Sequence, residues 1–132
     1  ETILASKTTK TTTLTNDEAS ETQFKSLNGK SPDIIHIATH GFFFKNNKAQ
    51  ANNDIEFKRA DNPLLRSGLL LAHANYAWQN GNNPYERNDG ILTALEISNL
   101  DLSKTDLVVL SACETGLGIL KVAKVFMVCN VL

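Results

Sequence analysis

Residues 34–41 read Ile-Ile-His-Ile-Ala-Thr-His-Gly, residues 106–113 read Asp-Leu-Val-Val-Leu-Ser-Ala-Cys, and these two stretches decide the fold of the 132-residue chain. Each apolar run is continuous rather than alternating and has the length of one strand. This pattern is typical of strands that are covered on both faces of a parallel sheet. We therefore expect an α/β fold with a mainly parallel sheet flanked by helices.

The other elements are predicted from apolar spacing and from turn and capping residues. In chain order, we expect a weak strand over residues 7–15, a short helix over 17–27, a loop over 42–66, a strand over 67–74, a loop over 76–89, and a strand that runs into a short helix over 91–100.

The composition is that of a soluble globular domain. Hydrophobic residues make up 42% and charged residues 20%, with 13 basic and 14 acidic side chains, so charge predicts neither a nucleic-acid nor a membrane partner. No apolar run approaches the roughly 20 residues of a membrane span. Two cysteines, Cys113 and Cys129, are too few for a disulfide framework, which favours a reducing, cytoplasmic location. The start at Glu1, without an initiator Met or a signal peptide, suggests a piece of a longer protein.

Two of the buried strands end in reactive side chains that are followed closely by glycine. His40 precedes Gly41, and Cys113 precedes Gly116 by three residues. The carboxyl ends of parallel strands share one edge of a sheet, so His40 and Cys113 meet there if their strands are neighbours. A thiol beside an imidazole is a nucleophile with its base. The N–H groups of Gly41 and Cys113 are candidates for an oxyanion hole.

Other interpretations of these residues compete with catalysis. A cysteine at a strand end is more often a core residue, and a lone histidine is more often structural. His36 shares a strand face with His40 and is expected to be a packed or hydrogen-bonded neighbour. A metal site of His36, His40 and Cys113 fits no standard zinc spacing, so we expect no metal and no cofactor. His73 has no evident partner, and for residues 42–44, Phe-Phe-Phe, core packing is favoured over a substrate-binding wall.

Four segments in order resemble the CHAT domain family. Residues 33–42 resemble its His motif and residues 107–118 its Cys motif, while residues 62–69 and 89–97 match segments that lie between the two. The resemblance covers most of residues 20–118.

The resemblance implies a caspase-like α/β fold, in a clan that includes separases, and peptide hydrolysis by a Cys/His dyad. It implies His40 as general base, Cys113 as nucleophile, and the Gly41 and Cys113 amides as the oxyanion hole. It also implies a protein or peptide substrate, and TPR or other repeats elsewhere in the parent chain. The alternative is a non-catalytic caspase-like module for protein interaction.

The resemblance stops after Gly118, so we divide the chain into a partial CHAT domain, residues 1–118, and an atypical tail, residues 119–132. One extra G before a permitted coding of the tail yields a segment very like the missing family sequence. In that frame, Phe126-Met127-Val128 must read as Tyr-Gly or His-Gly. We therefore hypothesise that the tail is a frameshift product and that the domain is truncated. An apolar helix is one structure that the tail is able to form, and Cys129 is given no role.

Overall fold

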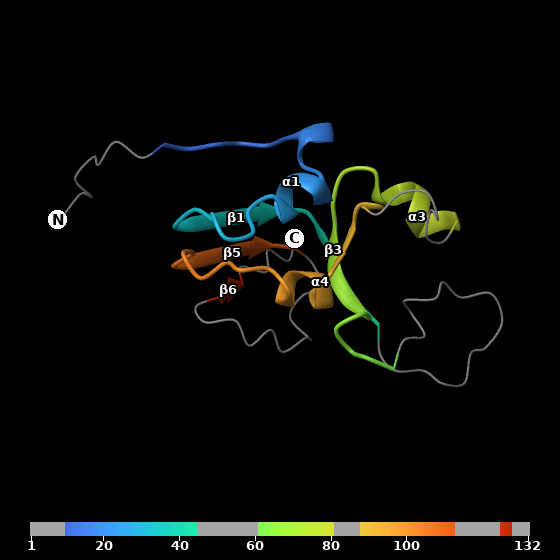
Figure 1. Ribbon diagram of the computed structural model, residues 1–132. Coiled ribbons are helices and arrows are strands. Elements are labelled where there is room, and N and C mark those ends of the chain that lie inside the picture. Colours follow the sequence, from blue (N-terminus) through green and yellow to red (C-terminus); the bar gives the residue numbers. More distant parts are fainter. Residues whose placement is uncertain (1–9, 45–60, 81–87, 113–124, 128–132) are drawn as a thin grey trace.

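The computed structural model describes residues 10–44, 61–80, 88–112 and 125–127, and these residues form two small sheets. A parallel sheet has the order β1-β5-β6, with β1 at Ile34–Ala38, β5 at Leu107–Ser111 and β6 at Val125–Met127. An antiparallel sheet has the order β2-β3-β4, with β2 at His40–Phe43, β3 at Ser67–Leu70 and β4 at Ile91–Thr93 (Figure 1). The α/β class is confirmed. A mainly parallel sheet is expected from the sequence, but only one of the two described sheets is parallel.

Backbone contacts before the strands fix the parallel register of β1 and β5. The N–H groups of Asp106 and Leu107 both donate to the carbonyl oxygen of Asp33, at 2.7 and 3.1 Å. From there the two strands run in step, until Ala38 lies beside Ser111 at their carboxyl ends. The two sequence runs that decide the fold are therefore direct neighbours.

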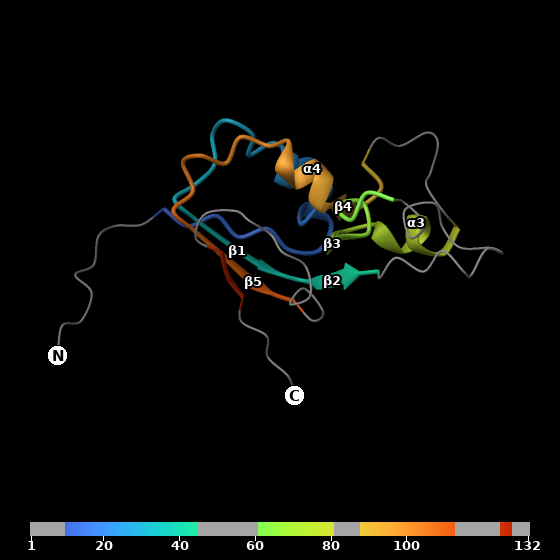
Figure 2. The ribbon, with the colours of Figure 1, turned by 90° about the horizontal axis from the view of Figure 1, so that it is seen from below.

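The β1 strand is covered on one face only, so the expectation of two covered faces is wrong. Ile35 is buried and Ile37 is partly buried. On the alternate positions, Ile34 keeps 59% of its surface exposed, and His36 and Ala38 are exposed as well. Figure 2 shows α1 and α4 together on one side of the β1–β5 ribbon. An apolar run predicts a strand, but the number of faces covered depends on elements that are remote in sequence.

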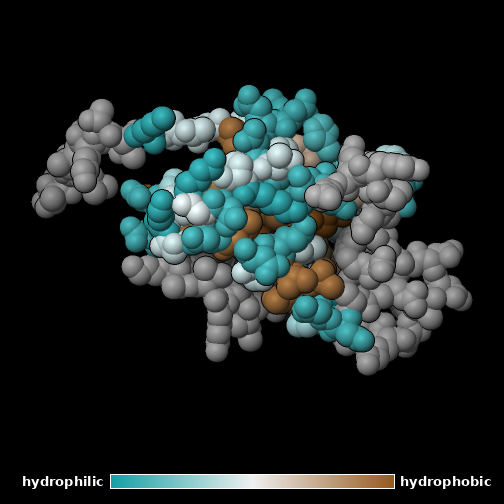
Figure 3. All heavy atoms as spheres, viewed as in Figure 1, coloured by the Kyte–Doolittle hydropathy of each residue, from teal (hydrophilic) through white to brown (hydrophobic). Residues whose placement is uncertain are grey.

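Two hydrophobic clusters hold the sheets together. The first contains buried Phe42, Ala74, Ala77 and Ile91, and the second contains buried Leu69, Leu110 and Ala112. The second cluster joins β3 to β5 and therefore connects the antiparallel sheet to the parallel one. On the face seen in Figure 3, hydrophilic residues predominate, with an apolar patch where Figure 1 draws α4.

Short helices link the strands. They are the 3-10 helix η1 (Asn16–Glu18), α1 (Glu21–Lys25), α3 (Ala74–Asn80) and α4 (Ala94–Ser98). The Ser20 hydroxyl accepts a hydrogen bond from the Gln23 N–H at the start of α1. Thr93 and Glu96 form a capping box, which confirms the predicted strand that runs directly into a helix. No helix within the described ranges is long and apolar enough to cross a membrane.

Several predicted boundaries are wrong. The described part of the predicted first strand, residues 10–15, is irregular, and the predicted helix over 17–27 is divided between η1 and α1. The loop predicted over 76–89 begins inside α3, because Ala74 and Ala77 find an apolar surface to pack on. An apolar helix in the tail is contradicted at residues 125–127, which form the strand β6, while the rest of the tail lies outside the described residues.

A buried ion network joins α1 to α4 and to the segment before β4. The ammonium group of Lys25 donates to the Glu21 carboxylate, to Glu96 at 2.8 Å and to the side-chain oxygen of Asn88 at 3.0 Å. Glu21 is 2% exposed and also accepts the N–H of Gly90 at 2.9 Å. The network satisfies a carboxylate that is otherwise expensive to bury.

Candidate active site at the end of the parallel sheet

His40 lies where the chain passes from one sheet to the other. The parallel strand β1 ends at Ala38, one residue intervenes, and His40 begins β2 opposite Leu70 of β3. The intervening Thr39 donates its hydroxyl to the carbonyl oxygen of Leu70, which anchors the change of sheet. The imidazole of His40 is exposed. A base that must exchange protons with substrate and water needs this access.

The parallel register brings the ends of the two key strands together. Ala38 and Ser111 are the last paired residues of β1 and β5. His40 and Cys113 each follow by two positions in sequence. Cys113 and Gly116 lie outside the described residues, so the contact between thiol and imidazole stays a prediction.

The structure confirms the hydrogen-bonded interpretation of His36. Its Nε2 atom lies 3.0 Å from Oγ of Ser111, which connects β1 to β5 on the exposed face of the sheet. In the described part of the chain, no three His, Cys, Asp or Glu side chains are grouped in a way that suits a metal ion.

Gly41 lies in β2, and its backbone N–H and C=O groups point away from the neighbouring strand β3. The N–H of Phe44 donates to the carbonyl oxygen of Arg66 at 2.8 Å, so Phe44 belongs to a hydrogen-bonded antiparallel pair. Such pairs alternate along a ladder, so the backbone groups of His40 and Phe42 also face β3. Those of Gly41 and Phe43 then face the outer edge. Among the described strands, β2 is an edge strand.

An aromatic cluster adjoins the histidine on β2. Phe42, Phe44 and Trp78 have ring centroids 5.5 to 5.9 Å apart. Phe42 is buried, so the predicted core role is confirmed for it, whereas Phe44 and Trp78 are only partly buried. Sequence reasoning missed Trp78, because its segment was expected to be a loop.

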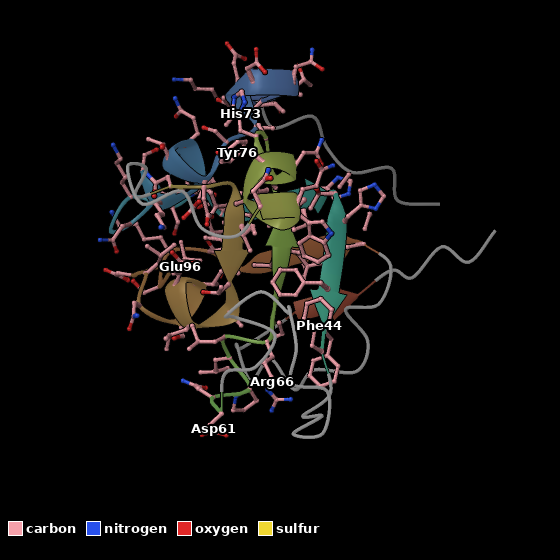
Figure 4. All side chains as sticks on the ribbon, turned by 90° about the vertical axis from the view of Figure 1, so that its right-hand side faces the viewer. Phe44, Asp61, Arg66, His73, Tyr76 and Glu96 are labelled. Carbon is pink, nitrogen blue, oxygen red and sulfur yellow. The ribbon has the colours of Figure 1, made fainter. Side chains whose placement is uncertain are left out.

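Arg66 is a second side chain that sequence reasoning missed. It is 7% exposed, and its Nη1 donates to the carbonyl oxygen of Phe44 at 2.8 Å. Its Nε is buried and has no hydrogen-bond acceptor among the residues that the structure describes. Figure 4 shows Arg66 and Phe44 near the end of β2, away from His73 and Tyr76. The available signal was an arginine inside the apolar sequence Leu64-Leu65-Arg66-Ser67-Gly68-Leu69.

His73 does have a partner, contrary to expectation. It adopts a left-handed backbone conformation with φ 70°, and its Nε2 lies 3.7 Å from a carboxylate oxygen of Asp17. Both side chains are largely exposed, so this pair contributes little stability.

The structure thus places β1, from which the chain continues to His40, beside β5, which ends at Ser111. The family model described as "CHAT domain" matches residues 2–127, so the chain belongs to the CHAT domain family. Membership of this family indicates a caspase-like module related to peptidases. No curated protein and no solved structure matches the chain.

Proposed function

We propose that this domain is a cysteine endopeptidase with Cys113 as nucleophile and His40 as general base. The observation that carries the proposal is the parallel register of β1 and β5. The paired register ends at Ala38 and Ser111, and His40 and Cys113 each follow two positions later in sequence. Membership of the CHAT family supports the same assignment.

The chemistry requires proton transfer at two points. In the proposed reaction, His40 removes the proton from Cys113, and the thiolate forms a bond to the carbonyl carbon of the peptide. The C–N bond then breaks, and the leaving amine takes the proton from His40. Water, with His40 again acting as base, hydrolyses the thioester and releases the acid. The edge-facing N–H of Gly41, with that of Cys113, supplies the proposed oxyanion hole.

Labelling of Cys113 with a small neutral electrophile across pH tests the dyad. We would use a Cys129→Ser background, so that Cys113 is the single thiol. Reaction well below the ordinary thiol pKa, lost in His40→Ala but kept in His73→Ala, is the expected result. His73 is a suitable control because it is exposed and pairs only weakly with Asp17. Ordinary thiol behaviour in all variants would show that no dyad is assembled.

A non-catalytic interaction module is the second candidate. The exposed face of β1 favours it, because Ile34, the first residue of that strand, keeps 59% of its surface in solvent. A normal Cys113 pKa in a folded chain, together with binding of a protein partner that Ile34→Ser abolishes, would support this candidate. For either candidate we propose a protein partner, with TPR or similar repeats elsewhere in the parent chain and a cytoplasmic setting.

A further inference from the structure

A side-chain hydrogen bond between His36 and Ser111 joins β1 to β5 at the carboxyl end of the parallel sheet. Nε2 of His36 lies 3.0 Å from Oγ of Ser111. In the register, His36 is paired with Val109 and Ser111 with Ala38, so this bond runs diagonally toward the strand ends. It lies on the exposed face of the sheet, opposite α1 and α4 (Figure 2). The contact therefore holds the last residue of β5 against β1.

Apolar packing holds the other face of the same strand end. Leu110 and Ala112, the neighbours of Ser111 in sequence, are 5% and 6% exposed and share a hydrophobic cluster with Leu69 of β3. Successive side chains of a strand point to opposite faces. Packing thus restrains the end of β5 on one face, and the hydrogen bond to His36 restrains it on the other. Together they set the direction in which the chain leaves β5.

The chain leaves β1 through a second polar anchor. Thr39 donates its hydroxyl to the carbonyl oxygen of Leu70 directly before His40. Ser111 precedes Cys113 by two residues, so both members of the proposed dyad follow closely on a side chain that is hydrogen-bonded to another strand. A misplacement of about 1 Å between reacting groups is able to lower a rate about a hundredfold. The geometry of such a pair therefore depends on the bonds that support it.

We propose that His36 is a positioning residue, which through its hydrogen bond to Ser111 holds the end of β5 so that Cys113 meets His40. This inference rests on the proposed function of the Cys113 and His40 pair. His36 transfers no proton in it. A hydroxyl both donates and accepts, so either tautomer of the imidazole makes the bond. A neutral amide that reaches the same hydroxyl should therefore replace the imidazole.

The test is the labelling of Cys113 by a small neutral electrophile across pH, in the Cys129→Ser chain. About two pH units below the ordinary thiol pKa, the labelling rate should fall at least about tenfold in His36→Ala and in Ser111→Ala. Both substitutions remove the same bond, so the double variant should lose no more than either single variant. His36→Gln and Ser111→Thr keep a hydrogen-bonding group at each position and should restore most of the rate.

Thr105→Val is the matched control at the opposite end of the same strand pair. The Thr105 hydroxyl donates to the carbonyl oxygen of Pro32 at 2.8 Å, which links the segments that precede β5 and β1. Like Ser111→Ala, the control removes one hydroxyl and one hydrogen bond between these parts of the chain. A merely structural role predicts that both variants lower stability and leave the pH profile of labelling unchanged. The positioning role predicts a changed pH profile for Ser111→Ala alone.

An unchanged labelling profile in folded His36→Ala and Ser111→Ala would overturn the proposal, and so would losses that multiply in the double variant. Failure of the proposed function gives a different result. In that case the Cys129→Ser chain already shows ordinary thiol behaviour and His40→Ala changes nothing, which refutes the dyad and its positioning together. If His36→Ala does not fold, Ser111→Ala decides, because it removes a single oxygen atom from a partly exposed side chain.

Discussion

Replacement of Lys25 by Met should expose how strongly the helices α1 and α4 depend on the buried ion network. The substitution keeps most of the apolar stem and removes the ammonium group that contacts Glu21, Glu96 and Asn88. Glu21 then remains buried, with the N–H of Gly90 as its recorded donor. Breaking a buried pair by removing one partner costs about 3–5 kcal/mol. Because the Lys25 side chain is 27% exposed, we expect the lower end of that range, about 3 kcal/mol.

Urea unfolding at neutral pH, followed by circular dichroism and by Trp78 fluorescence, measures this cost. Lys30→Met is the matched control, because Lys30 is exposed and its replacement should change the free energy of unfolding by less than about 0.5 kcal/mol. In Glu21→Gln, the Lys25→Met substitution should cost much less, since the partner left behind is neutral. A cost below about 1 kcal/mol for Lys25→Met, or an unchanged cost in Glu21→Gln, would refute the reasoning.

The three ionisable groups of the network titrate in different directions. Burial raises the pKa of Glu21 despite its hydrogen bonds to Lys25 and Gly90. For Lys25, burial alone lowers the pKa, but hydrogen bonds to Glu21 and Glu96 outweigh burial and raise it above 10.5. Burial would also raise the pKa of Glu96, but hydrogen bonds from Lys25 and Thr93 hold it below its ordinary value. A lysine whose pKa is raised by folding stabilises the fold at pH values below its pKa in the unfolded chain. That stabilisation is lost as pH rises through the pKa of the folded state. A lowered carboxyl pKa stabilises above the unfolded value and loses its effect as pH falls.

Further predictions concern titration, capping and close packing. The free energy of unfolding, measured against pH, should fall as pH rises through the raised pKa of Lys25, and Lys25→Met should lack this part of the profile. Thr93→Ala removes the hydroxyl of the capping box and should cost about 1 kcal/mol in urea unfolding, while Thr93→Ser should retain most of the stability. Gly68→Ala should destabilise by about 1–3 kcal/mol, because a Cβ there would lie 2.9 Å from the Cα of Thr93 and in collision with the Leu92 carbonyl. A Gly68→Ala cost below about 0.5 kcal/mol would contradict the packing argument.

The sequence alone determined the parts of this protein that depend on local pattern. Residues 34–41 and 106–113 carry enough apolar and β-branched side chains to specify strands, and β1 and β5 are found there as neighbours. Thr93 and Glu96 specify a helix start from a spacing of three residues, and α4 begins at that point. The sequence also predicts that His40 and Cys113 meet beyond these strand ends; the register of β1 with β5 is described up to Ser111, and the meeting of the two side chains stays a prediction.

Only the tertiary structure decided which faces are covered and which polar groups are buried. Ile34 and Ile35 are adjacent residues of the same type, but Ile34 is 59% exposed and Ile35 is 8% exposed. They differ because α1 and α4 lie on a single side of the sheet. The burial of Arg66 and of Glu21 is equally unreadable from local sequence. The environment of each side chain depends on segments that are remote in sequence. Arg66 donates to the carbonyl oxygen of Phe44 after β2, and Glu21 lies in a network with Gly90 and Glu96. Burial is a property of the assembled chain, so the side chains with the most demanding environments were those that sequence reasoning missed.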